Sequence, residues 1–100
     1  MFKGTTPTHT FGIDIDPSII KSVKITYYQR DNEILVKRTD DCTIENGKIS
    51  TKLSQEDTFL FEANTIVTIQ VRILTTSADA LISDLIMTSV GKCLDKEVLV

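Results

Sequence analysis

One stretch of the chain reads Thr65-Ile66-Val67-Thr68-Ile69-Gln70-Val71-Arg72-Ile73-Leu74. Apolar and polar residues alternate along it with a period of two, so one side carries Val67, Ile69, Val71 and Ile73. This pattern is typical of a β-strand that turns one face to a core and the other to water. The same alternation recurs in most stretches between residues 11 and 90, and it predicts an all-β protein.

Shorter strands are expected on either side of that stretch, over residues 9–15, 20–29, 33–38, 42–51 (as a hairpin) and 81–90. Turn signals separate them at spacings near ten residues, which indicates a single antiparallel β-sandwich, Ig-like, of about seven strands. Residues 1–100 then form one domain, with an extended lead-in over 1–7 and a C-terminal tail over 91–100. Ser54 with an acid three residues later signals a helix start, so one short helical turn is expected near residues 55–61, with Phe59 and Leu60 or Phe61 against the core.

The strongest local signal is Asn46-Gly47, between two alternating runs. This pair tolerates the two positive φ angles of a type I′ turn, whose twist matches that of the flanking strands. The resulting hairpin places Ile44 opposite Ile49 and Glu45 opposite Lys48, an apolar pair and an ion pair.

The last expected strand, residues 81–90, is apolar on both faces. Ile82, Ile86 and Val90 fall on one side, and the other side carries Leu81, Leu85 and Met87. A strand of this kind is either central in its sheet or in contact with a partner.

Composition and charge narrow the class of protein. The chain has 100 residues, of which 41% are hydrophobic, and a net charge of −3 with acids and bases interspersed. Nucleic-acid binding is disfavoured because it needs a clustered positive field. No apolar stretch approaches the length needed to cross a bilayer, and the N-terminus lacks the apolar region of a signal peptide. We therefore expect no membrane partner and a protein made in the cytoplasm.

Few residues suit catalysis or metal binding. His9 is the only histidine and is in phase with Phe11, so it is expected to pack at the start of a core face. Cys42 and Cys93 lie far apart and are expected to be free, partly or fully buried thiols. Asp14 and Asp16 could bind calcium or act as a carboxylate pair, but a solvated face running into an Asp-Pro turn explains them more simply. The residues favour a protein with no catalytic site, no metal and no cofactor.

The remaining candidates for function are surfaces. Tyr27 and Tyr28 fall on opposite faces of their strand, so Tyr27 is expected in the core and Tyr28 as an exposed anchor. The tail is apolar for a free terminus, and unpaired strand edges are open to a neighbour. The predicted partner contacts are Tyr28, Leu94, Val98 and Leu99. The alternative is a sandwich that binds a carbohydrate on a host surface, which the absence of tryptophan and the small number of exposed aromatic residues disfavour.

Three stretches resemble a known family: residues 4–11, residues 52–58, and residues 83–92 together with 94–98. They are similar to small proteins encoded in prophages of Firmicutes, chiefly Clostridia, found among phage structural genes. More distantly, the chain resembles the N-terminal β-sandwich module of phage baseplate upper proteins, which attaches larger pieces to a tail. The resemblance implies a non-enzymatic structural or accessory protein of the tail, baseplate or capsid. Its partners would be other phage structural proteins or further copies of itself, its location the assembled virion, and no catalytic residues are implied.

Overall fold

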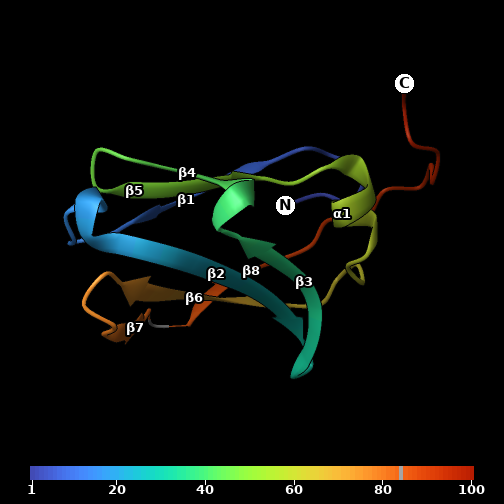
Figure 1. Ribbon diagram of the computed structural model, residues 1–100. Coiled ribbons are helices and arrows are strands. Elements are labelled where there is room, and N and C mark those ends of the chain that lie inside the picture. The colour runs from blue at the N-terminus through green and yellow to red at the C-terminus, as the bar shows by residue number, and fades with distance from the viewer. Residues whose placement is uncertain (84) are drawn as a thin grey trace.

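The computed structural model describes residues 1–83 and 85–100 and shows two antiparallel β-sheets that pack face to face (Figure 1). One sheet has the strand order β1-β5-β4, and the other has the order β3-β2-β6-β7, with β8 also paired to β6. The strands are β1 (Thr8–Gly12), β2 (Ile20–Gln29), β3 (Asn32–Arg38), β4 (Cys42–Glu45), β5 (Lys48–Lys52), β6 (Val67–Thr75), β7 (Ala80–Ile82) and β8 (Ile86–Thr88). The all-β sandwich predicted from the alternation is confirmed.

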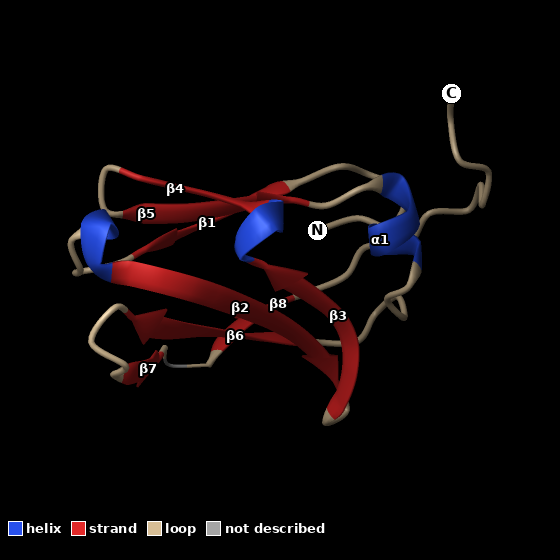
Figure 2. Cartoon of the chain, viewed as in Figure 1, coloured by secondary structure: helices blue, strands red, loops and turns tan. Residues whose placement is uncertain are grey.

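Three helical turns connect strands of one sheet to strands of the other (Figure 2). They are η1 (Pro17–Ile19), η2 (Thr39–Asp41) and α1 (Gln55–Phe59). The start of α1 is a capping box, in which the Ser54 hydroxyl accepts from the Asp57 amide at 3.0 Å and the Asp57 carboxylate accepts from the Ser54 amide at 2.9 Å. The helix predicted from this serine is confirmed.

The core lies between the two sheets and takes residues from both. Its buried hydrophobic members are Val23, Ile25, Tyr27, Ile49, Leu53, Phe61, Val67, Ile69, Val71, Ile73 and Val90. Tyr27 is fully buried, as its place in the alternation predicts. Phe11 and Ile44 are half-buried and pack against this core. Of Phe59, Leu60 and Phe61, Phe61 is the one that is fully buried.

Most strand limits agree with the alternation, and two differ at their ends. β2 spans residues 20–29 as predicted, whereas the long strand begins at Val67 and ends at Thr75. β1 ends at Gly12 rather than Ile15, although Ile13 and Ile15 still pack against the core. Pairing ends at Gly12 because its partner, Lys48, is the first residue of β5.

The Asn46-Gly47 hairpin is confirmed. Both residues have positive φ angles, 51° and 72°, and Ile44 lies opposite Ile49 as expected. Glu45 also lies opposite Lys48, but the predicted ion pair between them is wrong. Among the described residues the salt bridges are Arg30–Glu62 and Lys37–Asp57. The exposed pair gains too little in water to hold two long side chains in one geometry.

Substituting Gly47 by alanine is expected to lower the free energy of unfolding by about 1–2 kcal/mol, because an alanine is strained at a φ of 72°. Gly12→Ala is the matched control. Gly12 has no positive φ and has open space where a Cβ would go, so alanine there should leave stability unchanged or raise it by up to about 1 kcal/mol. Urea denaturation of both variants measures the contrast, and equal effects at the two sites would contradict it.

The prediction of one continuous strand over residues 81–90 is wrong. This segment is divided into β7 and β8, both of which pair with β6, and residue 84 between them lies outside the described residues. Ile82 pairs with Arg72, and Ile86 pairs with Ile69. Between these two pairs the sequence advances four residues from Ile82, whereas β6 advances three. A one-residue shift of this kind exchanges the two faces of a strand. It therefore settles an alternation that the sequence leaves ambiguous.

Both ends of the chain are attached to the body of the sandwich. Phe2 forms a parallel bridge with Gly91, and the N-terminal amino group donates to the Ser89 carbonyl at 2.9 Å. In the tail, the Gln55 side-chain amide donates to the Leu99 carbonyl and accepts from its N–H, at 2.9 Å and 2.8 Å. Within the described part of the chain, no helix has the length and apolar character required to span a membrane.

Candidate interaction site

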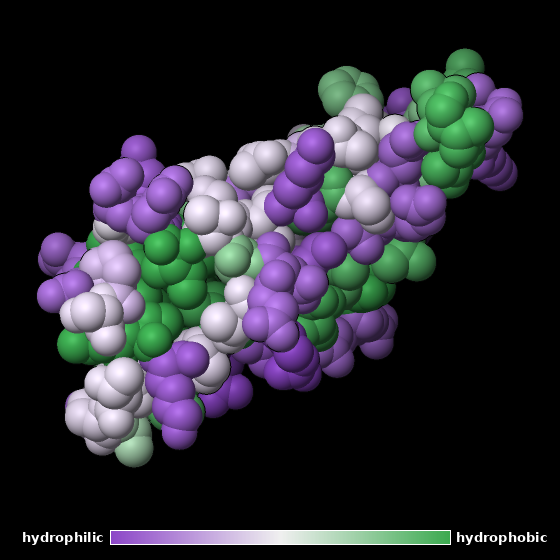
Figure 3. Space-filling view, turned by 45° about the horizontal axis from the view of Figure 1, so that its top comes forward, coloured by the Kyte–Doolittle hydropathy of each residue, from purple (hydrophilic) through white to green (hydrophobic). Residues whose placement is uncertain are grey.

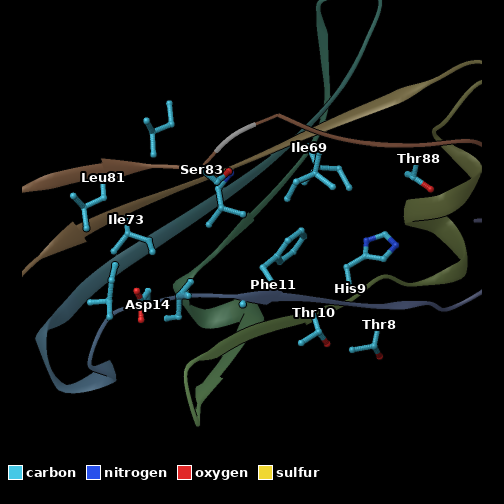
Figure 4. A pocket seen from close by; sticks show the side chains of 16 residues that line it. Thr8, His9, Thr10, Phe11, Asp14, Ile69, Ile73, Leu81, Ser83 and Thr88 are labelled. Atoms are coloured by element: carbon cyan, nitrogen blue, oxygen red, sulfur yellow. The ribbon is translucent and has the colours of Figure 1, made fainter.

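An apolar groove of about 700 Å³ opens between the two sheets along one side of the sandwich. β1 borders the groove from one sheet, and β6, β7 and β8 border it from the other. β1 is outermost in its sheet, and β7 and β8 lie at the outer edge of theirs. Figure 4 shows side chains from both sides directed into the space between them. The floor is formed by Ile69, Val71 and Ile73, which belong to the core. The groove is therefore the place where the interior of the sandwich reaches the surface.

β1 contributes the alternating side chains His9 and Phe11 to the groove, and Ile13, just after the strand, also lines it. His9 Nδ1 lies 2.8 Å from the Tyr27 hydroxyl, and the two ring centroids are 5.6 Å apart. Burial lowers the pKa of His9, and the nearby N-terminal charge lowers it further, which favours the neutral form of the ring. Burial likewise raises the pKa of Tyr27 well above its usual value. Both groups are thus held in their uncharged forms, which suits packing at the rim of a core.

The opposite rim of the groove carries five exposed hydrophobic side chains, which we call the apolar edge. Their exposed fractions are Leu81 41%, Ile82 63%, Leu85 57%, Ile86 37% and Met87 66%. The register with β6 assigns faces to four of them. Leu81 and Ile86 lie opposite Ile73 and Ile69, and so face the groove. Met87 lies opposite Thr68 and so faces outward, whereas Ile82 lies opposite Arg72 and also lines the groove. The edge is therefore apolar on both faces of the sheet.

Two other outer strands of the sandwich, β3 and β4, carry exposed charged residues. β3, at the far side of the same sheet, carries the exposed residues Glu33 and Arg38. β4, an outer strand of the second sheet, ends at the exposed Glu45. Charged residues on outer strands discourage pairing with another chain. The five residues of the apolar edge are uncharged, although Asp84 stands among them in the sequence, and their exposure makes this edge a surface suited to contact another protein.

The predicted contact residues lie in two other places. Tyr28 is half-buried on the outer face of β2, opposite Thr68 and Glu33. In the tail, Leu94 and Leu99 are 83% and 67% exposed, while Val98 is half-buried. The tail runs past α1 beyond the ends of the two sheets (Figure 1), and hydrophobic side chains gather at one end of the space-filling view (Figure 3). Val98 and Leu99 lie beside the start of α1, whereas Tyr28 belongs to β2, which lies between β3 and β6.

The apolar edge was absent from the predicted contact residues, although its signal is present in the sequence. Residues 81–90 are apolar on both faces, and this pattern indicates either a central strand or a strand that meets a partner. In the structure the segment lies at the edge, where β6 is its neighbour on one side. Of the two interpretations, the one with a partner fits this position.

The thiols and carboxylates named in the sequence have structural surroundings. Both cysteines are free and half-buried, and burial raises the pKa of the Cys42 thiol. Asp16 accepts a hydrogen bond from the Ser18 amide at 3.0 Å, which lowers the pKa of its carboxyl and fixes the start of η1. Asp14 lines the groove. Among residues 1–83 and 85–100, no three metal-binding side chains gather in one place.

No protein-family model, curated protein or solved structure matches this chain.

Proposed function

We propose that this chain is a non-enzymatic structural or accessory protein of a phage particle, associated with its tail, baseplate or capsid, and that it works through protein–protein contacts. The observation that supports a contact role is the apolar edge, whose five residues are between 37% and 66% exposed. Soluble domains rarely leave such a group of large hydrophobic side chains together on an unprotected strand edge unless another molecule covers it.

The phage assignment rests on the sequence resemblance to small prophage-encoded proteins, and the fold is compatible with it. A sandwich of two sheets is rigid and leaves strand edges to which a neighbouring protein can add. Such contacts need neither a bound cofactor nor a reactive side chain. His9 and the thiol of Cys42 are half-buried, and burial favours the uncharged form of each, which suits a packing role.

The composition of phage particles tests the proposal. After prophage induction in a strain that encodes this chain, particles purified on a density gradient are expected to contain it, as measured by mass spectrometry. An Ile82→Lys variant should be lost from the particles, because a charge on the apolar edge opposes burial. Leu60→Lys is the matched control, since Leu60 is 58% exposed at the end of α1, away from that edge. Particles that contain their other structural proteins but lack this chain would overturn the proposal.

A further inference from the structure

We propose that the outer face of the larger sheet holds a binding site for a phosphate group, formed by Arg38, Lys24 and Arg72. This inference goes beyond the proposed function and does not depend on it. Lys24 of β2 pairs with Arg38 of β3 on one side and with Arg72 of β6 on the other. Three cations therefore stand side by side across three strands, and we call them the basic row.

The three side chains of the basic row share the face of the sheet that is turned away from the core. Lys24 lies between Val23 and Ile25, both buried in the core, and successive side chains of a strand point to opposite faces. Arg38 and Arg72 lie directly opposite Lys24, so they take the same face as Lys24 does. Neighbouring strands are about 4.8 Å apart, which gives the row a span of about 10 Å.

A hollow of about 340 Å³ lies at the basic row, and all three cations line it. Ser22 also lines the hollow and adds a hydroxyl group that can donate a hydrogen bond. Because the donors surround one space, they suit a single compact anion better than an extended chain of separate charges. A phosphate group is small enough for the hollow and presents several acceptor oxygens to it.

The fold supplies no counter-charge for the basic row among the residues that the structure describes. The salt bridges there are Arg30–Glu62 and Lys37–Asp57, and neither involves the row. The Asp41 carboxylate accepts from the backbone amide of Arg38 at 2.9 Å, which leaves the guanidinium group for another partner. Like charges directly opposite each other destabilise a sheet, so an anion bound among these three side chains would relieve a cost built into the fold.

The chemistry of the three side chains favours phosphate over other anions. An arginine guanidinium can donate two parallel hydrogen bonds to a phosphate, and a lysine ammonium adds a point charge. A single carboxylate has one charge and two oxygens, too few to engage three cations. A nucleic-acid backbone needs positive charge along several successive phosphates. The basic row is short, and the chain as a whole has 14 acidic residues against 11 basic ones.

An NMR titration of the intact, isotope-labelled chain tests the inference. Inorganic phosphate and phenyl phosphate are added separately at about pH 8, where a phosphate group carries two charges, with ionic strength held constant by sodium chloride. Both should cause saturable shifts of the amide signals of Lys24, Arg38 and Arg72, with dissociation constants below about 10 mM. Binding of both probes supports a site for the phosphate group of a larger molecule, and binding of inorganic phosphate alone supports a site for the free ion.

Substitutions within the row show whether its charges carry the binding. Arg38→Gln, Lys24→Gln and Arg72→Gln should each raise the dissociation constant at least about fivefold, because each removes one charge-assisted contact. Arg38 and Arg72 are exposed and Lys24 is half-buried on the outer face, so the three variants should remain folded. Lys52→Gln is the matched control. Lys52 is an exposed cation of β5 in the other sheet, so its loss should change the dissociation constant by less than about twofold.

Three results would overturn the inference. The first is the absence of saturable shifts with either probe. The second is equal weakening by Lys52→Gln, since the binding would then follow net charge rather than the basic row. The third is binding of a thymidylate decamer without binding of inorganic phosphate, which would assign the row to a nucleic-acid backbone.

Discussion

Phe61→Ala is expected to lower the free energy of unfolding by about 3–5 kcal/mol, the largest stability effect that the structure indicates. Phe61 is fully buried, and its ring centroid lies 5.8 Å from that of Tyr27 in a tilted arrangement that adds to the packing. The residue follows α1 and closes the end of the core between the two sheets. Truncation would leave a cavity that the surrounding strands cannot fill without shifting, because sheet hydrogen bonds hold these strands in place.

Leu60→Ala is the control for this variant, since Leu60 is the adjacent residue but is 58% exposed. Its expected cost is below about 0.5 kcal/mol, as for most surface substitutions. Urea denaturation followed by circular dichroism gives both values from one type of measurement. Two variants of equal stability would show that Phe61 does not belong to the core, and a cost for Phe61→Ala below about 1 kcal/mol would mean the same.

The sequence predicts features of this fold that depend on neighbouring residues. Alternation along residues 20–29 reproduces both limits of β2 and places Tyr27 in the core, because each residue of a strand fixes the face of the next. Asn46-Gly47 identifies the hairpin because few residues tolerate two consecutive positive φ angles. Ser54 identifies α1 because its side chain satisfies an amide at the helix start.

The features that the sequence does not predict depend on pairing between distant segments. β5 pairs with β1, and β2 pairs with β6, yet no local signal specifies these two pairings. The division of residues 81–90 is visible only against β6, where the register shifts by one residue between Ile82 and Ile86. The groove has the same origin, since it exists only once β1 and β7 are the outer strands of two facing sheets.

The contact residues illustrate the same limit. Tyr28 and the tail residues Leu94, Val98 and Leu99 can be named from the sequence because each is an apolar or aromatic residue in an expected polar setting. The apolar edge has the stronger pattern, but its residues read equally well as a central strand. Knowing which strand lies outermost decides between the two interpretations, and that knowledge comes from the sheet order.

A second large effect on stability is expected at the ion pair between Lys37 of β3 and Asp57 of α1. Lys37 Nζ lies 2.7 Å from Asp57 Oδ2, and both side chains are less than a fifth exposed. Burial raises the pKa of Asp57, but hydrogen bonds from Lys37 and from the Ser54 amide outweigh it and hold the pKa below the usual 3.8. The sequence assigns Asp57 only to the first turn of a helix, because its partner is twenty residues away.

Asp57→Asn is expected to lower the free energy of unfolding by about 2–3 kcal/mol at pH 7, since it leaves Lys37 unpaired in a half-buried site and weakens the helix cap. Because the pKa of Asp57 is lower in the folded protein, the ionised carboxylate stabilises the fold above the unfolded value of 3.8. That contribution is complete above about pH 5 and is lost as the pH falls through the folded pKa. Urea denaturation at several pH values should therefore show the difference between the two proteins shrinking in acid. Glu56→Gln, at an exposed neighbouring acid, should show no such convergence with the unmodified protein. A difference for Asp57→Asn that stays constant from pH 7 to about pH 3 would mean that the ion pair does not stabilise the fold.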